Sequence, residues 1–189
     1  MSGKLVLGVD PGYANVGLSV LRKVKGSPPE LVFSRCLSAG NAGNLASFLG
    51  VTRKALSQIH EVYPFTEWAT EILPVLDNLN TTLNIRFASG MLWDAAHELT
   101  GHAPRLVSAQ TVKSCATRIL DIPNKKDVYV TKGQVGEAVH RVLGQNSLTH
   151  HENDASLVAL SAFFPTWITK QPAGISSPSK RSRKVSVRA

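Results

Sequence analysis

Apolar residues in the first forty positions of the chain occur in three short blocks, a pattern typical of β-strands. The blocks are Lys4–Asp10, Gly17–Lys25 and Leu31–Ser38. The run Gly26–Pro29 separates the second block from the third, and its glycine and prolines favour a chain reversal. We therefore predict that the chain opens with an antiparallel meander of three strands.

After the meander, predicted helices alternate with predicted strands. Short strands are expected at Phe65–Leu73 and Arg105–Val107. Apolar positions at helical spacing predict five helices: Leu45–Tyr63, Leu79–Leu99, a helix capped by Ser108, Thr131–Leu143, and a last helix from Thr149 to about Thr166. A meander followed by βαβαβ predicts an α/β fold with one five-stranded mixed sheet flanked by α-helices.

The second predicted helix has apolar side chains at every fourth position. We expect this row to face the core; it comprises Leu79, Leu83, Phe87, Met91, Ala95 and Leu99. Thr149 and Glu152, three residues apart, have the spacing of a capping box, so the last helix should begin there.

The 189 residues suit a single domain, and the charge is unevenly distributed over them. Residues 170–189 contain six basic and no acidic side chains, whereas residues 1–169 contain 15 basic and 13 acidic ones, a net charge of +2. We expect residues 1–169 to form the folded domain and residues 170–189 to be a disordered basic tail that adds salt-sensitive affinity for phosphates.

No apolar run approaches the length of a membrane span, and the N-terminus resembles neither a secretory signal nor a transit peptide. Cys36 and Cys115, the two cysteines, form no zinc-binding pattern. We therefore expect a cytoplasmic protein, in a bacterium or in the host of a virus, without a membrane partner.

Candidate metal ligands occur at the ends of predicted elements. Asp10 ends the first strand, Glu71 lies in the fourth, and His151 and Asp154 share one face of the last helix. Carboxylate oxygens and a single imidazole suit Mg²⁺ or Mn²⁺ and the hydrolysis of phosphodiesters.

Spacing alone leaves three of these assignments open. Glu67 lies on the same face of the fourth strand as Glu71, and His150 competes with His151, because residues four apart also share a helix face. Asp10 precedes Pro-Gly and could be a turn residue.

Three segments in order resemble motifs of the RuvC-type Holliday junction resolvases. Leu7–Gly12 (LGVDPG), followed by Gly17 and Val20, is similar to the family's first strand motif with its catalytic Asp. Trp68–Glu71 (WATE) resembles the second, a strand ending in Glu, and His151–Ala155 (HENDA) resembles the last. The resemblance, which extends from about Leu5 to Phe164, favours Glu71 over Glu67 and His151 over His150.

The resemblance implies an RNase H-like fold and a homodimer that nicks two opposed strands of a four-way DNA junction. It also implies two Mg²⁺ or Mn²⁺ ions per site, held by Asp10, Glu71, His151 and Asp154. Ser108–Lys113 and Lys132–Val135 resemble helix starts that bring a lysine to the site, so Lys113 and Lys132 become candidates for holding the scissile phosphate.

The chain departs from the family pattern at two places. The stretch between Lys113 and Lys132 is longer, and Pro74 occupies the position of an aromatic residue that stacks at the junction centre. Trp68 or Phe87 could supply such a ring, although both are expected in the core.

Three alternative functions remain open from the sequence. The first is a kinase of the actin-like superfamily, because the phosphate loop of these kinases also begins strand-Asp-x-Gly. The second is a related nuclease that acts on other branched DNA or on structured RNA. The third is a DNA-binding module without catalysis.

Overall fold

The predicted five-stranded mixed sheet is present in the computed structural model, which describes residues 3–39, 44–72, 78–123, 130–165 and 168. The strands lie in the order β3-β2-β1-β4-β5. Their bounds are β1 Lys4–Asp10, β2 Asn15–Lys23, β3 Glu30–Ser38, β4 Glu67–Glu71 and β5 Arg105–Val107. The β1–β2 and β2–β3 pairs are antiparallel, whereas β4 runs parallel to both β1 and β5. The meander and the βαβαβ unit are therefore both confirmed.

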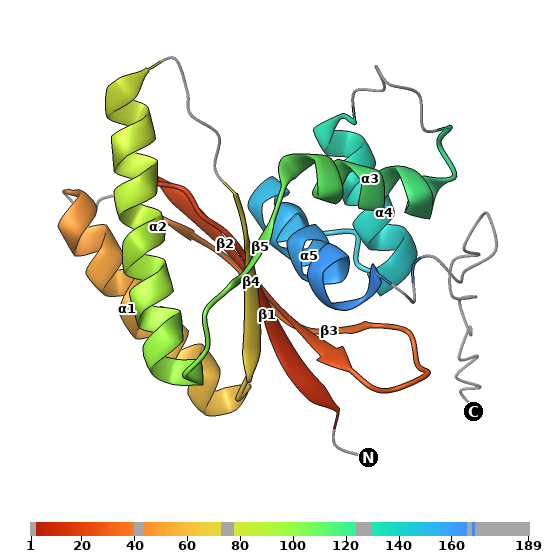
Figure 1. Ribbon diagram of the computed structural model, residues 1–189, viewed down its shortest axis with the longest axis horizontal. Coiled ribbons are helices and arrows are strands. Elements are labelled where there is room, and N and C mark those ends of the chain that lie inside the picture. The colour runs from red at the N-terminus through yellow and green to blue at the C-terminus, as the bar shows by residue number, and fades with distance from the viewer. Residues whose placement is uncertain (1–2, 40–43, 73–77, 124–129, 166–167, 169–189) are drawn as a thin grey trace, which may run out of the picture.

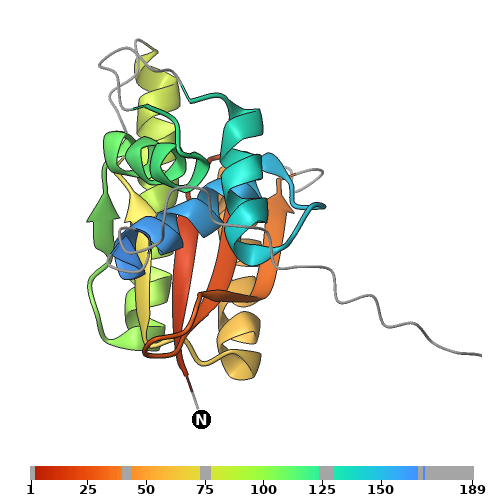
Figure 2. The ribbon, with the colours of Figure 1, turned by 90° about the vertical axis from the view of Figure 1, so that its right-hand side faces the viewer.

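Helices cover both faces of the sheet (Figure 1). Their bounds are α1 Leu45–Val62, α2 Leu79–Thr100, α3 Ala109–Leu120, α4 Lys132–Leu143 and α5 His150–Phe163. Helices α1 and α2 lie on one face, and α5 lies on the other with α3 and α4 outside it (Figures 1 and 2). None of the described helices is long and apolar enough to cross a bilayer. Residues 170–189, the expected tail, lie outside the described part of the chain.

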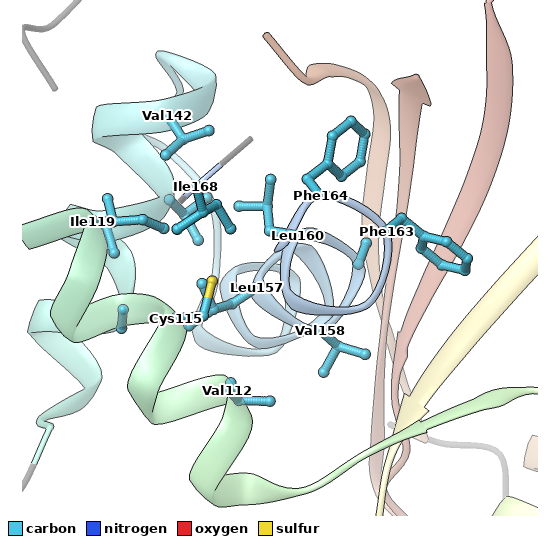
Figure 3. Packing of buried hydrophobic residues seen from close by; sticks show 14 of the residues in the cluster. Val112, Cys115, Ile119, Val142, Leu157, Val158, Leu160, Phe163, Phe164 and Ile168 are labelled. Atoms are coloured by element: carbon cyan, nitrogen blue, oxygen red, sulfur yellow. The ribbon is translucent and has the colours of Figure 1, made fainter. Parts of the chain in front are cut away.

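Helix α5 is the central element of the second layer, because it is buried between the sheet and two other helices. Leu157 and Leu160 are fully buried, and Phe163 is 3% exposed. They pack with Val112 and Ile119 of α3 in one apolar cluster, which also includes residues of α4 (Figure 3). This packing fixes α5 against the sheet, so the position of its first turn is set by the core.

Side chains at the helix starts explain where the helices begin. Ser108 accepts a hydrogen bond from the Thr111 amide, as predicted, and Thr149 forms the predicted capping box with Glu152. Gly101 ends α2 in the left-handed conformation, with φ of 70°. The last helix therefore starts where the sequence predicted.

The predicted packing face of α2 is wrong. Leu79, Leu83 and Phe87 are 67%, 54% and 58% exposed, and Met91 is 36% exposed. A four-residue repeat advances about 40° around the helix at each step, so the whole row cannot stay on the buried face. The buried side of α2 is formed mainly by small residues: Thr82, Ala88, Ser89, Leu92, Ala95 and Ala96. Of the expected row, only Ala95 is buried and Leu99 partly buried.

Candidate active site

The parallel pairing of β1 and β4 brings two candidate carboxylates to the same end of the sheet. Val9 pairs with Thr70, so Asp10 and Glu71 are the next residues along adjacent strands. Both strands end at these residues. Strand alternation directs Asp10 and Glu71 to the face that α5 covers, since Val6 and Ala69 of the same face pack in the α5 cluster.

The first turn of α5 supplies the other two candidate ligands. His151 Nδ1 lies 2.7 Å from Asp10 Oδ2 across 141 positions of the sequence. The proximity of Asp10 and Asp154 is reflected in the pKa of Asp154, which is raised to about 6 by burial first and then by the charge of Asp10. His151 and Asp154 therefore share the pocket with Asp10.

Glu71 belongs to the same cluster. Burial first, and then the charges of Asp10 and Asp154, raises its pKa to about 7. The pKa of His151 is also raised, chiefly by its hydrogen bond to Asp10. Three carboxylates and an imidazole from β1, β4 and α5 thus meet in one partly buried, negatively charged pocket.

Both lysines predicted from the sequence lie on the border of this cluster. Lys113 of α3 lowers the pKa of Glu71, and Lys132 at the start of α4 lowers the pKa of Asp154 and of His151. Both side chains are exposed. Each lysine therefore places a positive charge near a carboxylate of the cluster.

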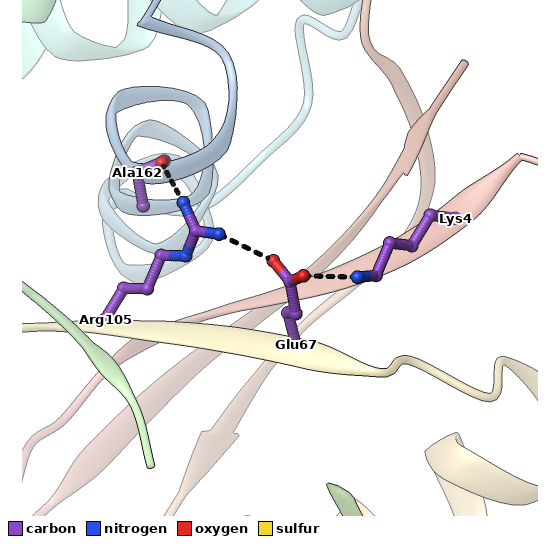
Figure 4. Close-up of polar contacts among 4 residues, drawn as sticks. All are labelled: Lys4, Glu67, Arg105 and Ala162. Carbon is purple, nitrogen blue, oxygen red and sulfur yellow. Dashed lines mark hydrogen bonds and ion pairs between the residues drawn. The ribbon is translucent and has the colours of Figure 1, made fainter. Parts of the chain in front are cut away.

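Glu67, the alternative to Glu71, lies at the opposite end of β4, where it forms ion pairs. It pairs with Lys4 and lies 3.0 Å from Arg105 Nη2, and Arg105 also donates to the Ala162 carbonyl (Figure 4). The bond from Lys4 is the main cause of the lowered pKa of Glu67. Glu67 therefore links β1, β4 and β5 to α5 and takes no part in the pocket.

The other open alternatives also have defined places. His150 is exposed, and no hydrogen bond of its side chain is found within the described residues. Trp68 is 1% exposed, which confirms its predicted core position, and its indole N–H donates a hydrogen bond to the His102 carbonyl. Phe87 is exposed on α2, contrary to expectation, and Pro74 lies outside the described residues.

Sequence reasoning missed how α5 approaches the sheet. A Cβ atom added to Gly17 would lie 2.0 Å from the His151 carbonyl oxygen, and one added to Gly8 would lie 2.1 Å from that of Ala155. Contacts this short exclude any side chain at these two positions. Glycines spaced along β1 and β2 were a visible signal, but their partner could not be identified without the fold.

A second missed contact joins α5 to strand β3. Glu152 accepts hydrogen bonds from the Thr149 hydroxyl at 2.7 Å and from the Ser34 hydroxyl at 3.0 Å. Ser19 and Ser156 bond at 2.7 Å one turn further along. These bonds fix the rotation of the helix turn that carries His151 and Asp154.

Comparison with known proteins identifies the family. The family model of the crossover junction endodeoxyribonuclease RuvC matches residues 6–162. The chain belongs to the RuvC family. It is therefore an endodeoxyribonuclease, an enzyme that hydrolyses phosphodiester bonds in DNA, and this assignment excludes the kinase and the non-catalytic alternatives. No curated protein sequence matches the chain.

Solved structures of RuvC proteins share the fold. T. thermophilus RuvC in complex with a Holliday junction substrate has a TM-score of 0.72 and 20% identity, covering 88% of this chain and 96% of that one. A second structure of Thermus thermophilus RuvC has a TM-score of 0.69 and 20% identity, with coverage of 87% and 96%. The yeast mitochondrial Holliday junction resolvase Ydc2 has a TM-score of 0.53 and 15% identity, with coverage of 88% and 78%. These matches confirm the RNase H-like fold.

The raised pKa values predict that the protein without divalent cations loses stability as pH rises. Glu71 and Asp154 have ordinary pKa values of 4.5 and 3.8, and folding raises them to about 7 and about 6. Since the folded state holds these protons more tightly, its stability is highest below the ordinary values and falls as pH rises through about 7. The raised pKa of His151 acts in the same direction.

Thermal unfolding in a chelator should therefore give a lower Tm at pH 8 than at pH 5.5. The double replacement Glu71→Gln with Asp154→Asn should flatten this dependence, because neither amide ionises. A Tm that is constant over this range in the unaltered protein would show that folding does not raise the pKa values of these carboxylates.

Proposed function

We propose that this chain is a divalent-metal-dependent, structure-selective endonuclease that resolves four-way DNA junctions by paired nicks. The observation that carries the proposal is the meeting of Asp10, Glu71, His151 and Asp154 in one pocket, in a chain of the RuvC family. Such a pocket combines the hard oxygen ligands and the single imidazole that Mg²⁺ and Mn²⁺ accept.

The electrostatics of the pocket fit a cation. Burial first, and then the charge of Asp10, raises the pKa of both Glu71 and Asp154, and a divalent ion would offset these carboxylate charges. Within the described part of the chain, no three His, Cys, Asp or Glu side chains already have the spacing of a metal site. We therefore propose that these four residues hold two ions only after small side-chain rotations.

A divalent ion held there would lower the pKa of a water molecule and neutralise charge on the leaving oxygen. The side chains have separate tasks. Asp10, central among the four, keeps His151 oriented through the 2.7 Å contact. Lys113 and Lys132 border the carboxylates and would hold the scissile phosphate, where positive charge also favours the transition state.

The proposed substrate rests on the relatives. One similar structure is of T. thermophilus RuvC with a Holliday junction substrate, and another is of a mitochondrial Holliday junction resolvase from yeast. The competing substrates are other branched DNA and structured RNA, which the same pocket would serve equally well.

A cleavage panel distinguishes these substrates. The full chain is incubated with a four-way junction, a flap, a linear duplex and a structured RNA, each with Mg²⁺, with Mn²⁺ and with a chelator. We expect metal-dependent paired nicks in the junction at least about tenfold faster than in any other substrate. Faster cleavage of the flap or the RNA would assign the pocket to that substrate instead.

The exposed row of α2 supports the proposed homodimer. Leu79, Leu83 and Phe87 present apolar side chains to solvent on one side of a long helix. Exposed apolar side chains that line up in this way mark protein interfaces, and a two-fold axis beside α2 would pack the row against its own copy. The predicted core row thus becomes the proposed contact between two copies.

Phe87→Asp should therefore give a monomer. Placing a charge at the centre of an apolar contact costs several kcal/mol and should shift dissociation by at least about a hundredfold. Analytical ultracentrifugation measures the change, and Val62→Asp is the matched control, because Val62 is 68% exposed on another helix. A dimer that is unaffected by Phe87→Asp would place the interface elsewhere.

A further inference from the structure

Strand β3 carries none of the candidate catalytic residues, but its side chains reach the helix turn that carries two of them. Ser34 of β3 pairs with Ser19 of β2 in the sheet. The Ser34 hydroxyl donates to Glu152 Oε1 at 3.0 Å, and the hydroxyls of Ser19 and Ser156 bond at 2.7 Å. Two residues of α5, one helical turn apart, are therefore bonded to two neighbouring residues of the sheet.

Both carboxylate oxygens of Glu152 are occupied by hydrogen bonds. Oε2 accepts from the Thr149 amide at 2.9 Å and from the Thr149 hydroxyl at 2.7 Å, whereas Oε1 accepts from Ser34. The carboxylate is therefore directed to the helix cap and to β3. Glu152 is a residue of the site's support, and we do not expect it to bind a cation itself.

Helix geometry places Glu152 and Asp154 on opposite sides of α5. Successive residues are about 100° apart around the axis, so these two side chains project about 160° apart. The strand order agrees, since β3 lies on one side of β1 and β4 lies on the other. Burial, Asp10 and Asp154 raise the pKa of Glu71, which puts Asp154 on the β4 side. The Ser34 bond thus holds α5 on the side away from Asp154.

The close approach at Gly17 makes rotation the motion that this bond controls. The His151 carbonyl oxygen would lie 2.0 Å from a Cβ atom added to Gly17, so α5 cannot move closer to β2. A glycine has no side chain to interlock with the helix, so its contact leaves rotation about the axis free. A rotation of about 10° moves side-chain atoms by about 1 Å, because they lie about 5–6 Å from the axis.

The Cys36 thiol, also on β3, lies close to the same helix turn and to the pocket. Burial raises the pKa of Cys36, and Thr149, Glu152 and Asp10 are near enough to shift it as well. Gly17 pairs with Asp10 on one side and with Cys36 on the other, so these three residues form one row across the sheet. A change in how α5 rests on β3 therefore takes place within reach of Asp10.

We infer that Glu152, held by Ser34, is a positioning residue for the cleavage reaction: it sets the rotation of α5 that directs His151 and Asp154 into the pocket. The inference rests on the proposed function, because rotation matters only if these two side chains bind a cation for catalysis. The competing explanation is that Glu152 only caps α5. A cap stabilises the start of a helix whichever way the helix faces, so it would act on stability alone.

Ser34→Ala separates the two explanations, because it removes the bond to the sheet and leaves the capping box intact. Ser34→Thr keeps a hydroxyl at the same position, and Glu152→Ala removes both the bond and the cap. Asn44→Ala is the matched control for a lost cap. Asn44 accepts from the Ser47 amide at 2.9 Å at the start of α1, on the other face of the sheet.

The experiment measures single-turnover and steady-state cleavage of a four-way junction, Mn²⁺ affinity by calorimetry, and Tm. Ser34→Ala should lower kcat and Mn²⁺ affinity by at least about tenfold each, with KM nearly unchanged and Tm little changed. Ser34→Thr should restore both quantities. Asn44→Ala should lower only Tm. Adding Ser34→Ala to Glu152→Ala should cause no further loss of kcat, because both changes remove the same bond.

Two results would overturn the inference alone, provided that the unaltered chain binds Mn²⁺ and cuts the junction. One is full kcat and full Mn²⁺ affinity in Ser34→Ala, which would leave Glu152 with capping only. The other is additive losses in the double variant, because the two residues would then act separately. If the unaltered chain neither binds Mn²⁺ nor cuts the junction, the proposed function has failed, and the inference fails with it.

Discussion

Replacing Asp10 by Asn is expected to lower the rate of junction nicking by about 10³-fold or more while junction binding is retained. The Asp10 carboxylate contacts His151 and raises the pKa of both Glu71 and Asp154, so it interacts with each of the other three residues. Asparagine has nearly the same shape, and the sheet around position 10 should be preserved. Single-turnover cleavage and a gel-shift assay in Ca²⁺ or chelator separate the two effects.

Glu67→Gln is the matched control for this replacement. It removes a carboxylate from the same sheet, but one that pairs with Lys4 and Arg105 away from the pocket (Figure 4). Nicking should be unchanged, with at most about 1 kcal/mol lost from the free energy of unfolding, because both ion pairs are partly exposed. Unreduced nicking by Asp10→Asn would contradict the proposed role of Asp10.

Gly17→Ala should have the second largest effect. The new methyl group would lie 2.0 Å from the His151 carbonyl oxygen and 2.5 Å from its carbon, so the first turn of α5 must move away from β2. A displacement of about 1 Å in a catalytic group can cost about a hundredfold in rate, and overpacking typically costs 1–3 kcal/mol of stability. We expect both losses, measured by single-turnover cleavage and by denaturant unfolding.

Gly50→Ala is the control, since a methyl group at Gly50 meets no other atom within 4 Å. It should leave cleavage unchanged and raise stability by up to about 1 kcal/mol, because alanine favours helix. If Gly17→Ala were as active and as stable as Gly50→Ala, the close approach of α5 to the sheet would not position the site.

Much of the fold followed from local patterns. Strand alternation, turn residues and caps predicted each element, and errors were mostly confined to the ends. For example, β2 begins at Asn15 instead of Gly17, and β4 covers Glu67–Glu71 instead of Phe65–Leu73. Pairing with Ser38 and Leu37 of β3 extends β2 to Asn15, an influence that the local pattern does not contain.

The packing face of α2 could not be predicted in the same way. The large apolar side chains Leu83 and Phe87 were expected inside, but small residues such as Ala88 and Ala96 occupy the contact. Small residues allow a close approach of α2 to α1, and this advantage depends on the tertiary neighbours. An exposed apolar row is also what a dimer requires, and no single-chain pattern distinguishes a core from an interface.

The sequence named the candidate residues of the site, but it could not predict how they are arranged in space. Spacing left Glu67 and Glu71 equivalent, and the parallel register of β1 with β4 distinguishes them, because it places Glu71 beside Asp10. The choice of His151 over His150 similarly depends on the contact with Asp10.

Titration of the protein with Mn²⁺ by calorimetry at pH 7.5 tests whether the three carboxylates and the imidazole form one cation site. Asp10→Asn, Glu71→Gln, His151→Ala and Asp154→Asn should each weaken Mn²⁺ binding by at least about tenfold, and Glu67→Gln should leave it unchanged. Mn²⁺ affinity that is unaffected by all four replacements would contradict the account, because the side chains would then not form a common cation site.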